Sequence, residues 1–163
     1  DALIRTLSIL PEFLKSREQG QIIDYRDWSV PLGRRFRALK LWMVIRSYGA
    51  DGLRKIVRRH IELAAELEGW IAAEPDFEIV APRSLALINF RYRPEGMPEG
   101  EDLDRLNGTL LQRINDDGRI YLTQNKVRGR AAIRFSVGQT NTERRHVVEG
   151  WDVVKEIARE FRR

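Results

Sequence analysis

The spacing of apolar residues changes at Pro75, and this change limits the fold more than any other feature of the sequence. Before Pro75, apolar residues recur at the three- and four-residue spacing that places side chains on one face of a helix: Leu53, Ile56, Val57, Ile61, Ala64, Leu67 and Ile71. After Pro75, the segments 77–80 and 84–92 are typical of strands, with Pro82 between them. A helix followed by two strands is therefore predicted.

The remaining segments repeat this order. Residues 103–115 predict a helix with one apolar face, formed by Leu103, Leu106, Leu110 and Ile114. Segments 119–123 and 131–137 alternate as strands do, and Gly129 lies in the turn between them. From Gly49 onward the predicted order is α-β-β-α-β-β-α, which indicates a two-layer α+β domain with a mostly antiparallel sheet.

The last predicted helix has a start signal and an apolar face. Thr140 and Glu143 have the spacing of a capping box. The face expected to be buried holds Val147, Trp151, Val154, Ala158 and Phe161.

The first 48 residues follow a different pattern. A short helical stretch at 2–10 is interrupted by Pro11, and residues 11–31 have the few apolar anchors of a surface loop. After Pro31 and Gly33 a helix is predicted through about Tyr48. Its segment 41–45, Leu-Trp-Met-Val-Ile, is apolar nearly all round, so we expect it to be buried.

Composition excludes several functions. The chain has no cysteine and two histidines, which excludes disulfides and thiolate chemistry and argues against a histidine metal cluster. No apolar run approaches the roughly 18 residues needed to cross a bilayer. Arg26 to Arg59 carries ten Lys/Arg against two acids. However, Phe36 and Trp42 fall within an apolar helical pattern, so a nucleic acid is not the expected partner. A membrane is not expected either, because the apolar runs are too short.

No catalytic triad or metal-ligand spacing occurs in the sequence, so composition alone favours a binding or accessory domain. The chain begins at Asp1 without a methionine. We therefore expect it to be a piece of a longer protein.

Long specific motifs carry a family resemblance. The block from Asp24 to Ala65, with Asp-Tyr-Arg at 24–26 and Pro-Leu-Gly-Arg-Arg-Phe-Arg at 31–37, is joined by Ile-Arg-Phe-Ser-Val-Gly-Gln-Thr-Asn-Thr at 133–142. Together they resemble the C-terminal third of the pyridoxal-phosphate-dependent aromatic L-amino-acid decarboxylases, the group II decarboxylases. The implied activity converts aromatic L-amino acids to amines and CO2.

The resemblance implies an α+β fragment of a type I pyridoxal-phosphate-dependent fold, the aspartate-aminotransferase-like fold. Residues 1–48 would be the end of the large cofactor-binding domain, with a mobile catalytic loop at about 9–22 and an interface helix. Residues 49–163 would be the small C-terminal domain.

The resemblance also implies a cofactor and partners. Pyridoxal 5'-phosphate would be bound mainly by the upstream region, because this chain lacks the family's His-Lys pair. Lys40 is not expected to replace that lysine, and no cofactor-binding residue is predicted in the chain. The expected partners are the upstream part, on the same or a separate polypeptide, a second subunit in a homodimer, and a small amino acid. The expected location is the cytoplasm.

Phe13 is the first predicted site residue. The resemblance places it in the loop context Pro-x-Tyr-Leu-Lys, where the decarboxylases have the tyrosine that returns a proton to the substrate α-carbon. A phenyl ring has no proton to donate. In aromatic acetaldehyde synthases of this family, phenylalanine at this position accompanies oxygen-dependent formation of aldehyde, ammonia and peroxide. That activity is the alternative, unless Tyr25 or water supplies the proton.

Gly33 is the second predicted site residue, because the matching position in the family lines the pocket for the substrate side chain. Glycine accompanies bulky aromatic substrates there and serine accompanies histidine; Gly33 also suits the turn after Pro31. Arg26 and Arg34 are expected to support the pocket wall and nearby loops through bidentate hydrogen bonds, or to tie the two domains together. A third interpretation, a stand-alone basic binding domain, stays open.

Overall fold

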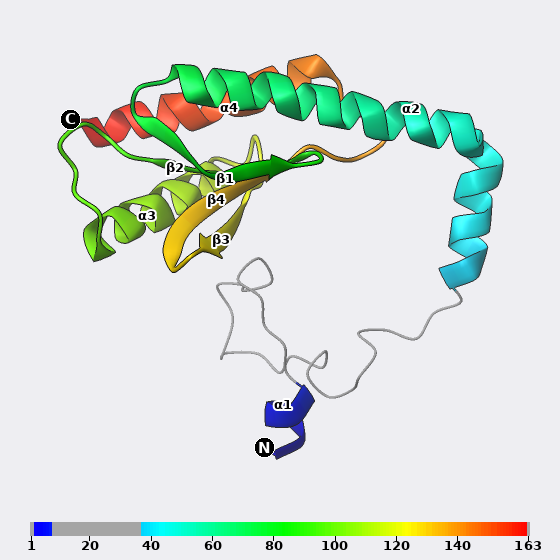
Figure 1. Cartoon of the computed structure of the whole chain (residues 1–163), viewed down its shortest axis with the longest axis horizontal. Helices are drawn as coiled ribbons and strands as arrows, with labels where there is room; N and C mark the ends of the chain where they lie inside the picture. Colours follow the sequence, from blue (N-terminus) through cyan, green and yellow to red (C-terminus); the bar gives the residue numbers. More distant parts are fainter. Residues whose placement is uncertain (1, 8–36, 163) are drawn as a thin grey trace. The chain divides into compact units, whose positions relative to one another are not determined.

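The structure is a computed structural model that describes residues 2–7 and 37–162 (Figure 1). The chain divides into two units, Asp1–Leu53 and Arg54–Arg163. The predicted domain boundary between residues 48 and 49 lies five residues before this division. Helix α2, Arg37–Ala73, crosses the division.

The first unit contains α1, Ala2–Leu7, and the first part of α2. The backbone leaves helical geometry at Gly49, with φ 66° and ψ 168°, which agrees with the predicted break there. Glycine adopts this left-handed φ without the clash that a Cβ would cause. No helix among the described residues combines the length and apolar character needed to span a membrane.

The predicted burial of residues 41–45 is wrong for this structure. The side chains of Leu41, Trp42 and Met43 are more than half exposed, and Val44 and Ile45 are close to it. An apolar helix surface is buried only when other elements cover it, and the described residues of this chain do not cover this segment.

The second unit has the predicted order of elements. It continues with β1, Phe77–Ser84, β2, Leu87–Tyr92, and α3, Glu101–Asp117. It ends with β3, Thr123–Val127, β4, Arg130–Ser136, α4, Arg144–Arg159, and a short 3-10 helix, Glu160–Arg162. The four strands form one sheet in the order β1-β2-β4-β3, and every neighbouring pair is antiparallel.

One apolar core joins the sheet to the helices α2, α3 and α4. Alternate residues of β2 and β4 enter it, including Phe90 and Ile133, as do Leu67, Leu110 and Trp151 from the three helices. The rings of Phe90 and Trp151 meet edge to face at 5.7 Å. Because side chains alternate along a strand, the intervening residues lie on the other face of the sheet.

Helix α4 is held against α2 by charged side chains as well. Arg144 contacts Glu66 at 2.6 Å and lies over the ring of Trp70. Lys155, further along α4, lies 3.7 Å from Glu74. Figure 1 shows the two helices running along the same side of the sheet.

Several predicted boundaries are wrong. Pro82 is not a break between the first two strands, because β1 runs through it to Ser84. Strand β3 begins at Thr123 instead of residue 119, because the side chain of Asn115 on α3 binds both the N–H and the C=O of Leu122. Helix α4 begins at Arg144, and its capping box pairs Glu143 with His146 instead of Thr140 with Glu143. Hydrogen bonds within residues 138–142 hold this loop outside the helix.

Candidate functional site

The polar face of the sheet, opposite the apolar core, gathers side chains that hydrogen-bond to one another. Asn89 and Arg91 of β2 lie on this face, and both are buried. Asn125 of β3 donates a hydrogen bond to Asn89 at 2.9 Å, although β4 runs between their strands. The two side chains can meet across β4 because the β4 residue paired with Asn125 is Ala132. Its methyl group is small and leaves room above the sheet.

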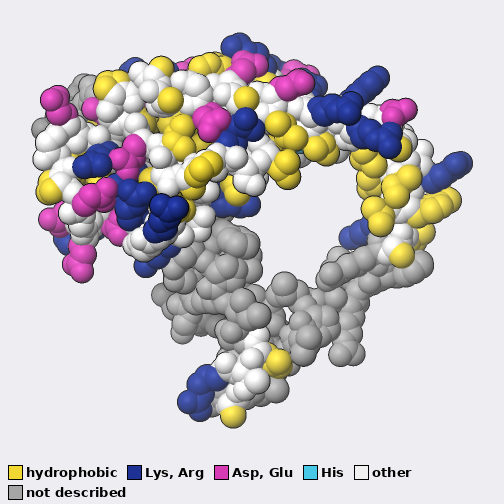
Figure 2. Space-filling model, in the orientation of Figure 1, with side chains coloured by type: hydrophobic (Ala, Val, Ile, Leu, Met, Phe, Trp, Pro, Cys, Tyr) yellow, Lys and Arg dark blue, Asp and Glu magenta, His cyan; other side chains and the backbone are white. Residues whose placement is uncertain are grey.

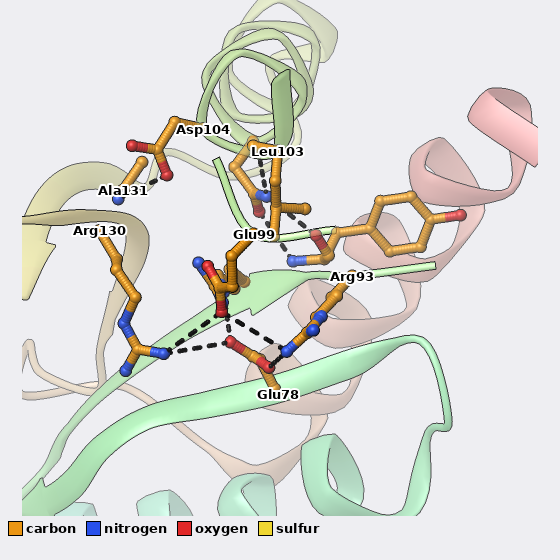
Figure 3. Close-up of polar contacts among 10 residues, drawn as sticks. Glu78, Arg93, Glu99, Leu103, Asp104, Arg130 and Ala131 are labelled. Atoms are coloured by element: carbon orange, nitrogen blue, oxygen red, sulfur yellow. Dashed lines mark hydrogen bonds and ion pairs between the residues drawn. The ribbon is translucent and has the colours of Figure 1, made fainter. Parts of the chain in front are cut away.

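A charge cluster occupies one end of this polar face (Figure 3). The Arg91 guanidinium is fully buried and donates hydrogen bonds to Glu78 on β1 and to Glu99 in the loop before α3. Arg93 contacts the same two carboxylates at 3.0 and 3.5 Å. Arg130 of β4 lies 3.6 Å from Glu99. The cluster therefore ties β1, β2, β4 and the β2–α3 loop together.

The electrostatics of the cluster favour fixed charges. Burial lowers the pKa of Arg91, but the hydrogen bonds to Glu99 and Glu78 outweigh that effect and leave the pKa raised. The hydrogen bond from Arg91 holds the pKa of Glu99 below its ordinary value. Near neutral pH these groups stay charged, so neither is suited to transfer protons. The cluster positions the loop and the strands.

Acid should therefore loosen this loop. A folded-state pKa below the unfolded one means that the unfolded chain binds more protons, so stability rises with pH in this range. The contribution of Glu99 is complete above the ordinary glutamate pKa of about 4.3 and is lost as pH falls through the lower folded value. We expect the melting temperature to fall between about pH 5 and pH 3, measured by circular dichroism.

Glu99→Gln tests this assignment. The variant should melt below the wild type at pH 7, and its melting temperature should depend less on pH in the acid range. Glu95→Gln changes an exposed carboxylate in the same loop and serves as the control. Parallel pH profiles of Glu99→Gln and the wild type would contradict the assignment.

Two side chains of α3 complete the sheet where β2 and β4 diverge. The last paired residues of the ladder are Phe90 and Ile133. Beyond them, Asn107 accepts from the N–H of Tyr92 at 2.7 Å and donates to its C=O at 2.8 Å. Asp104, one turn earlier on α3, accepts from the N–H of Ala131 at 2.9 Å (Figure 3). Asn107 is 2% exposed, so water cannot replace these bonds.

A groove of about 660 Å³ lies beside the loop 138–142, which ends the family motif at 133–142. Phe135, Val137 and Val147 supply apolar lining, and Asn141 and Thr142 supply polar lining. The groove opens where residues 119–122 have separated from β4, and it includes Tyr121, which is 76% exposed.

Both histidines of the chain hold this loop. His60 donates from Nε2 to the carbonyl oxygen of Gln139 at 3.0 Å. His146 accepts at Nδ1 from the N–H of Glu143 at 3.0 Å. Because one ring nitrogen of each histidine bonds to a backbone group, the two imidazoles act as structural anchors.

The predicted site residues Phe13, Gly33, Arg26 and Arg34 lie outside the described residues. The described residues do not form a site for pyridoxal phosphate. Lys40 and Lys55 are exposed on α2, Lys126 is exposed on β3, and Lys155 is paired with Asp152 at 3.1 Å. The groove lining contains no lysine. Within residues 2–7 and 37–162, no cluster of His, Cys, Asp and Glu could hold a metal ion.

A family model described as "Pyridoxal-dependent decarboxylase conserved domain" matches residues 1–93. The chain belongs to this family. Its match includes the predicted site residues Phe13, Arg26, Gly33 and Arg34 as well as the first two strands.

Several curated relatives of the chain are named for an aromatic amino acid or for an aromatic aldehyde. Tyrosine decarboxylase 1 of Narcissus pseudonarcissus is 43% identical, over 96% of this chain and 32% of the relative. Tryptophan decarboxylase TDC1 of Camptotheca acuminata is 42% identical, with the same coverage. Phenylacetaldehyde synthase of Arabidopsis thaliana is 41% identical, over 97% of this chain and 32% of the relative. The chain spans about a third of the length of these relatives.

Solved structures of the family share its fold. Oryza sativa TDC with PLP and tryptamine superposes with a TM-score of 0.71 and 36% identity, over 97% of this chain and 33% of that one. Rhodiola rosea 4-hydroxyphenylacetaldehyde synthase superposes with a TM-score of 0.69 and 36% identity, over 98% of this chain and 32% of that one. The prediction of an α+β fragment of a type I pyridoxal-phosphate-dependent fold is confirmed.

Sequence reasoning missed the polar residues that organise this family member. Asn107 lies between Leu103 and Leu110 on the predicted apolar face of α3. A polar residue at this position indicates a buried hydrogen-bonding role. Arg91 alternates with Phe90 and Tyr92 in β2, which places it off the core face but does not predict its burial.

Proposed function

We propose that this chain is the C-terminal part of a pyridoxal-phosphate-dependent decarboxylase that converts aromatic L-amino acids to amines and CO2. One observation carries the proposal: nearly the whole chain aligns with plant tyrosine and tryptophan decarboxylases at 42–43% identity. Within this proposal, the described residues have a structural role. Their buried polar groups hold strands and loops in place and do not form a proton-transfer site.

The alternative is decarboxylation coupled to aldehyde formation. Phe13 favours it, because phenylalanine cannot return a proton to the substrate. Two similar proteins are named as aldehyde synthases, one from Arabidopsis thaliana and one from Rhodiola rosea. Both activities start from an aromatic amino acid and release CO2, so the product distinguishes them.

A chimera tests both activities. The third of Oryza sativa TDC that matches this chain would be replaced by this chain, and purified protein would be given tryptophan, tyrosine, phenylalanine or dihydroxyphenylalanine. Amine, aldehyde, CO2 and hydrogen peroxide would be measured separately. CO2 with an equal amount of amine supports the decarboxylase, and CO2 with aldehyde and peroxide supports the synthase. A folded, cofactor-loaded chimera that releases no CO2 from any of them would refute both.

The site residues keep their predicted roles in this proposal. Phe13 occupies the position of the family's proton donor, and Gly33 lines the substrate pocket. Arg26 and Arg34 support the pocket wall. The proposal also includes a homodimer in the cytoplasm, with residues 1–48 completing the large domain and residues 49–163 forming the small one.

Gly33→Ser in the chimera tests the pocket role. An added hydroxymethyl group should narrow the pocket, so kcat/KM for tryptophan should fall by roughly 10- to 200-fold. The loss for smaller amino acids should be much less. An equal loss for all substrates would mean that Gly33 serves the turn after Pro31 and not the pocket.

A further inference from the structure

The loop between β4 and α4, residues 137–143, is held near each end by one of the two histidines of the chain. Near its start, the Nε2 of His60 on α2 lies 3.0 Å from the carbonyl oxygen of Gln139. At its end, the backbone N of Glu143 lies 3.0 Å from the Nδ1 of His146 on α4. Both contacts join an imidazole to the backbone of the loop.

The two histidines have opposite roles in these hydrogen bonds. A carbonyl oxygen only accepts, so His60 must donate, and a protonated imidazole donates as well as a neutral one does. A backbone N–H only donates, so the Nδ1 of His146 must offer a lone pair, which this atom has only while the ring is neutral. Acid therefore leaves the first bond in place and breaks the second.

The start of helix α4 depends on this acceptor, because the ring of His146 is half of the capping box. The side chain of Glu143 accepts from the backbone N–H of His146, and the ring of His146 accepts from the N–H of Glu143. Glutamate or glutamine ordinarily fills this third helical position. A histidine makes the cap sensitive to pH, since histidine ordinarily changes its charge between pH 5 and 8.

The surroundings of the His146 ring leave this change of charge to the histidines. Other charged or titratable groups near the ring are Arg59 on α2, Arg119 and Tyr121 before β3, and Glu143, Arg145 and Glu149 at the start of α4. A hydrogen bond from Arg145 holds the pKa of Glu143 below its ordinary value, so this carboxylate stays charged. Figure 2 shows acidic and basic side chains mixed over the second unit, and such groups ordinarily keep their charges between pH 5 and 8.

Protonation of His146 should loosen both halves of the capping box. The N–H of Glu143 loses its acceptor and turns to water, since Glu143 is exposed. The positive ring is attracted to the Glu143 carboxylate and competes for it with the backbone N–H of His146. Positive charge at the N-terminus of a helix is also unfavourable in itself.

We propose that His146 is a pH-dependent cap of α4: as the pH falls from about 8 to about 5, its protonated ring releases Glu143 and the first turn of the helix loosens. Asn141, Thr142 and His146 line the groove beside the loop, so this side of the groove should move with the helix start. His60 keeps its bond to Gln139 throughout, which confines the movement to the end of the loop next to α4. None of these steps requires the proposed enzymatic activity.

NMR spectra of the full chain between pH 8 and pH 5 test the proposal. The amide proton of Glu143 should shift with the same midpoint pH as the ring of His146, and so should the methyl groups of Val137 and Val147, which line the groove. The protection factor of the Val147 amide, corrected for the intrinsic exchange rate, should fall by roughly 3- to 30-fold, the range that loss of a helix cap produces.

Two substitutions separate the roles of the histidines. His146→Gln keeps an acceptor at the third helical position but does not titrate, so the Glu143 amide and the Val147 protection should no longer depend on pH in this range. His60→Gln keeps a donor toward Gln139 and should retain the pH dependence of the wild type. Amides of residues 95–99, beside the charge cluster, are the internal control and should not respond above about pH 5.

Any of four results would overturn the proposal. In the wild type, these are a His146 ring that keeps one charge state from pH 8 to pH 5, or a ring that titrates while the Glu143 amide and the Val147 protection stay constant. In the variants, they are an unchanged pH dependence in His146→Gln or its loss in His60→Gln. If a variant does not fold, the comparison of midpoints in the wild type decides.

Discussion

Asn107→Ala should destabilise the second unit by about 2–6 kcal/mol, because two buried backbone groups lose their partners and each costs about 1–3 kcal/mol. The amide of Asn107 binds the N–H and the C=O of Tyr92 at 2.7 and 2.8 Å. Tyr92 is 1% exposed, so water cannot take over either bond. A few kcal/mol is a large part of the stability of a domain this size.

Urea unfolding of the full chain, followed by far-ultraviolet circular dichroism, measures this loss. Thr109→Ala on the same helix is the control, because Thr109 is exposed and donates to the carbonyl oxygen of Arg105 within its own helix. It should change stability by less than about 0.5 kcal/mol. Asn115→Ala should fall between the two: Asn115 binds Leu122 in the same bidentate way but is only half-buried. Equal effects of Asn107→Ala and Thr109→Ala would show that Tyr92 finds other partners.

The order of elements in the second unit could be predicted because each element has a long apolar period. The buried face of β4, with Ile133, Phe135 and Val137, follows directly from alternation, and all three are buried. The same holds for Leu103, Leu110 and Ile114 on α3. These residues enter one core, so local pattern and tertiary packing agree.

Boundaries set by long-range side-chain bonds could not be predicted in this way. Residues 119–122 alternate like a strand, but Asn115 takes the backbone groups of Leu122 and the ladder starts only at Thr123. The polar cluster has the same origin: Glu78, Arg91 and Glu99 meet only after the sheet has formed and the loop has folded over it. The apolar period of each element does not predict contacts between polar side chains of different elements.

The segment 41–45 shows a different limit. Its all-round apolar pattern predicts burial, because a helix with apolar side chains on every face is typical of a protein interior. Burial also requires other residues that cover the helix, and the pattern of the segment says nothing about them. The exposed side chains of residues 41–45 therefore contradict the predicted burial.

Replacing Phe13 by tyrosine in the Oryza sativa TDC chimera should move the product from aldehyde toward amine, with the amine-to-aldehyde ratio rising by roughly 10²–10⁴, the usual contribution of a positioned proton donor. Loss of CO2 leaves a carbanion that must either receive a proton or react by another route. A tyrosine hydroxyl can donate that proton, and the phenyl ring of Phe13 cannot. The peroxide yield should fall in parallel with the aldehyde.

The controls for Phe13→Tyr isolate the hydroxyl group. Phe13→Leu removes the ring without adding a donor, so its product ratio should remain that of the wild-type chimera. Tyr25→Phe tests the competing donor that the sequence offers near Phe13. If the wild-type chimera already yields amine with almost no peroxide, Phe13→Tyr should have no effect and Tyr25→Phe should lower the amine yield. That pair of results would assign the proton to Tyr25 and refute the role of position 13. If neither substitution changes the ratio, the proton comes from water or from another group of the enzyme.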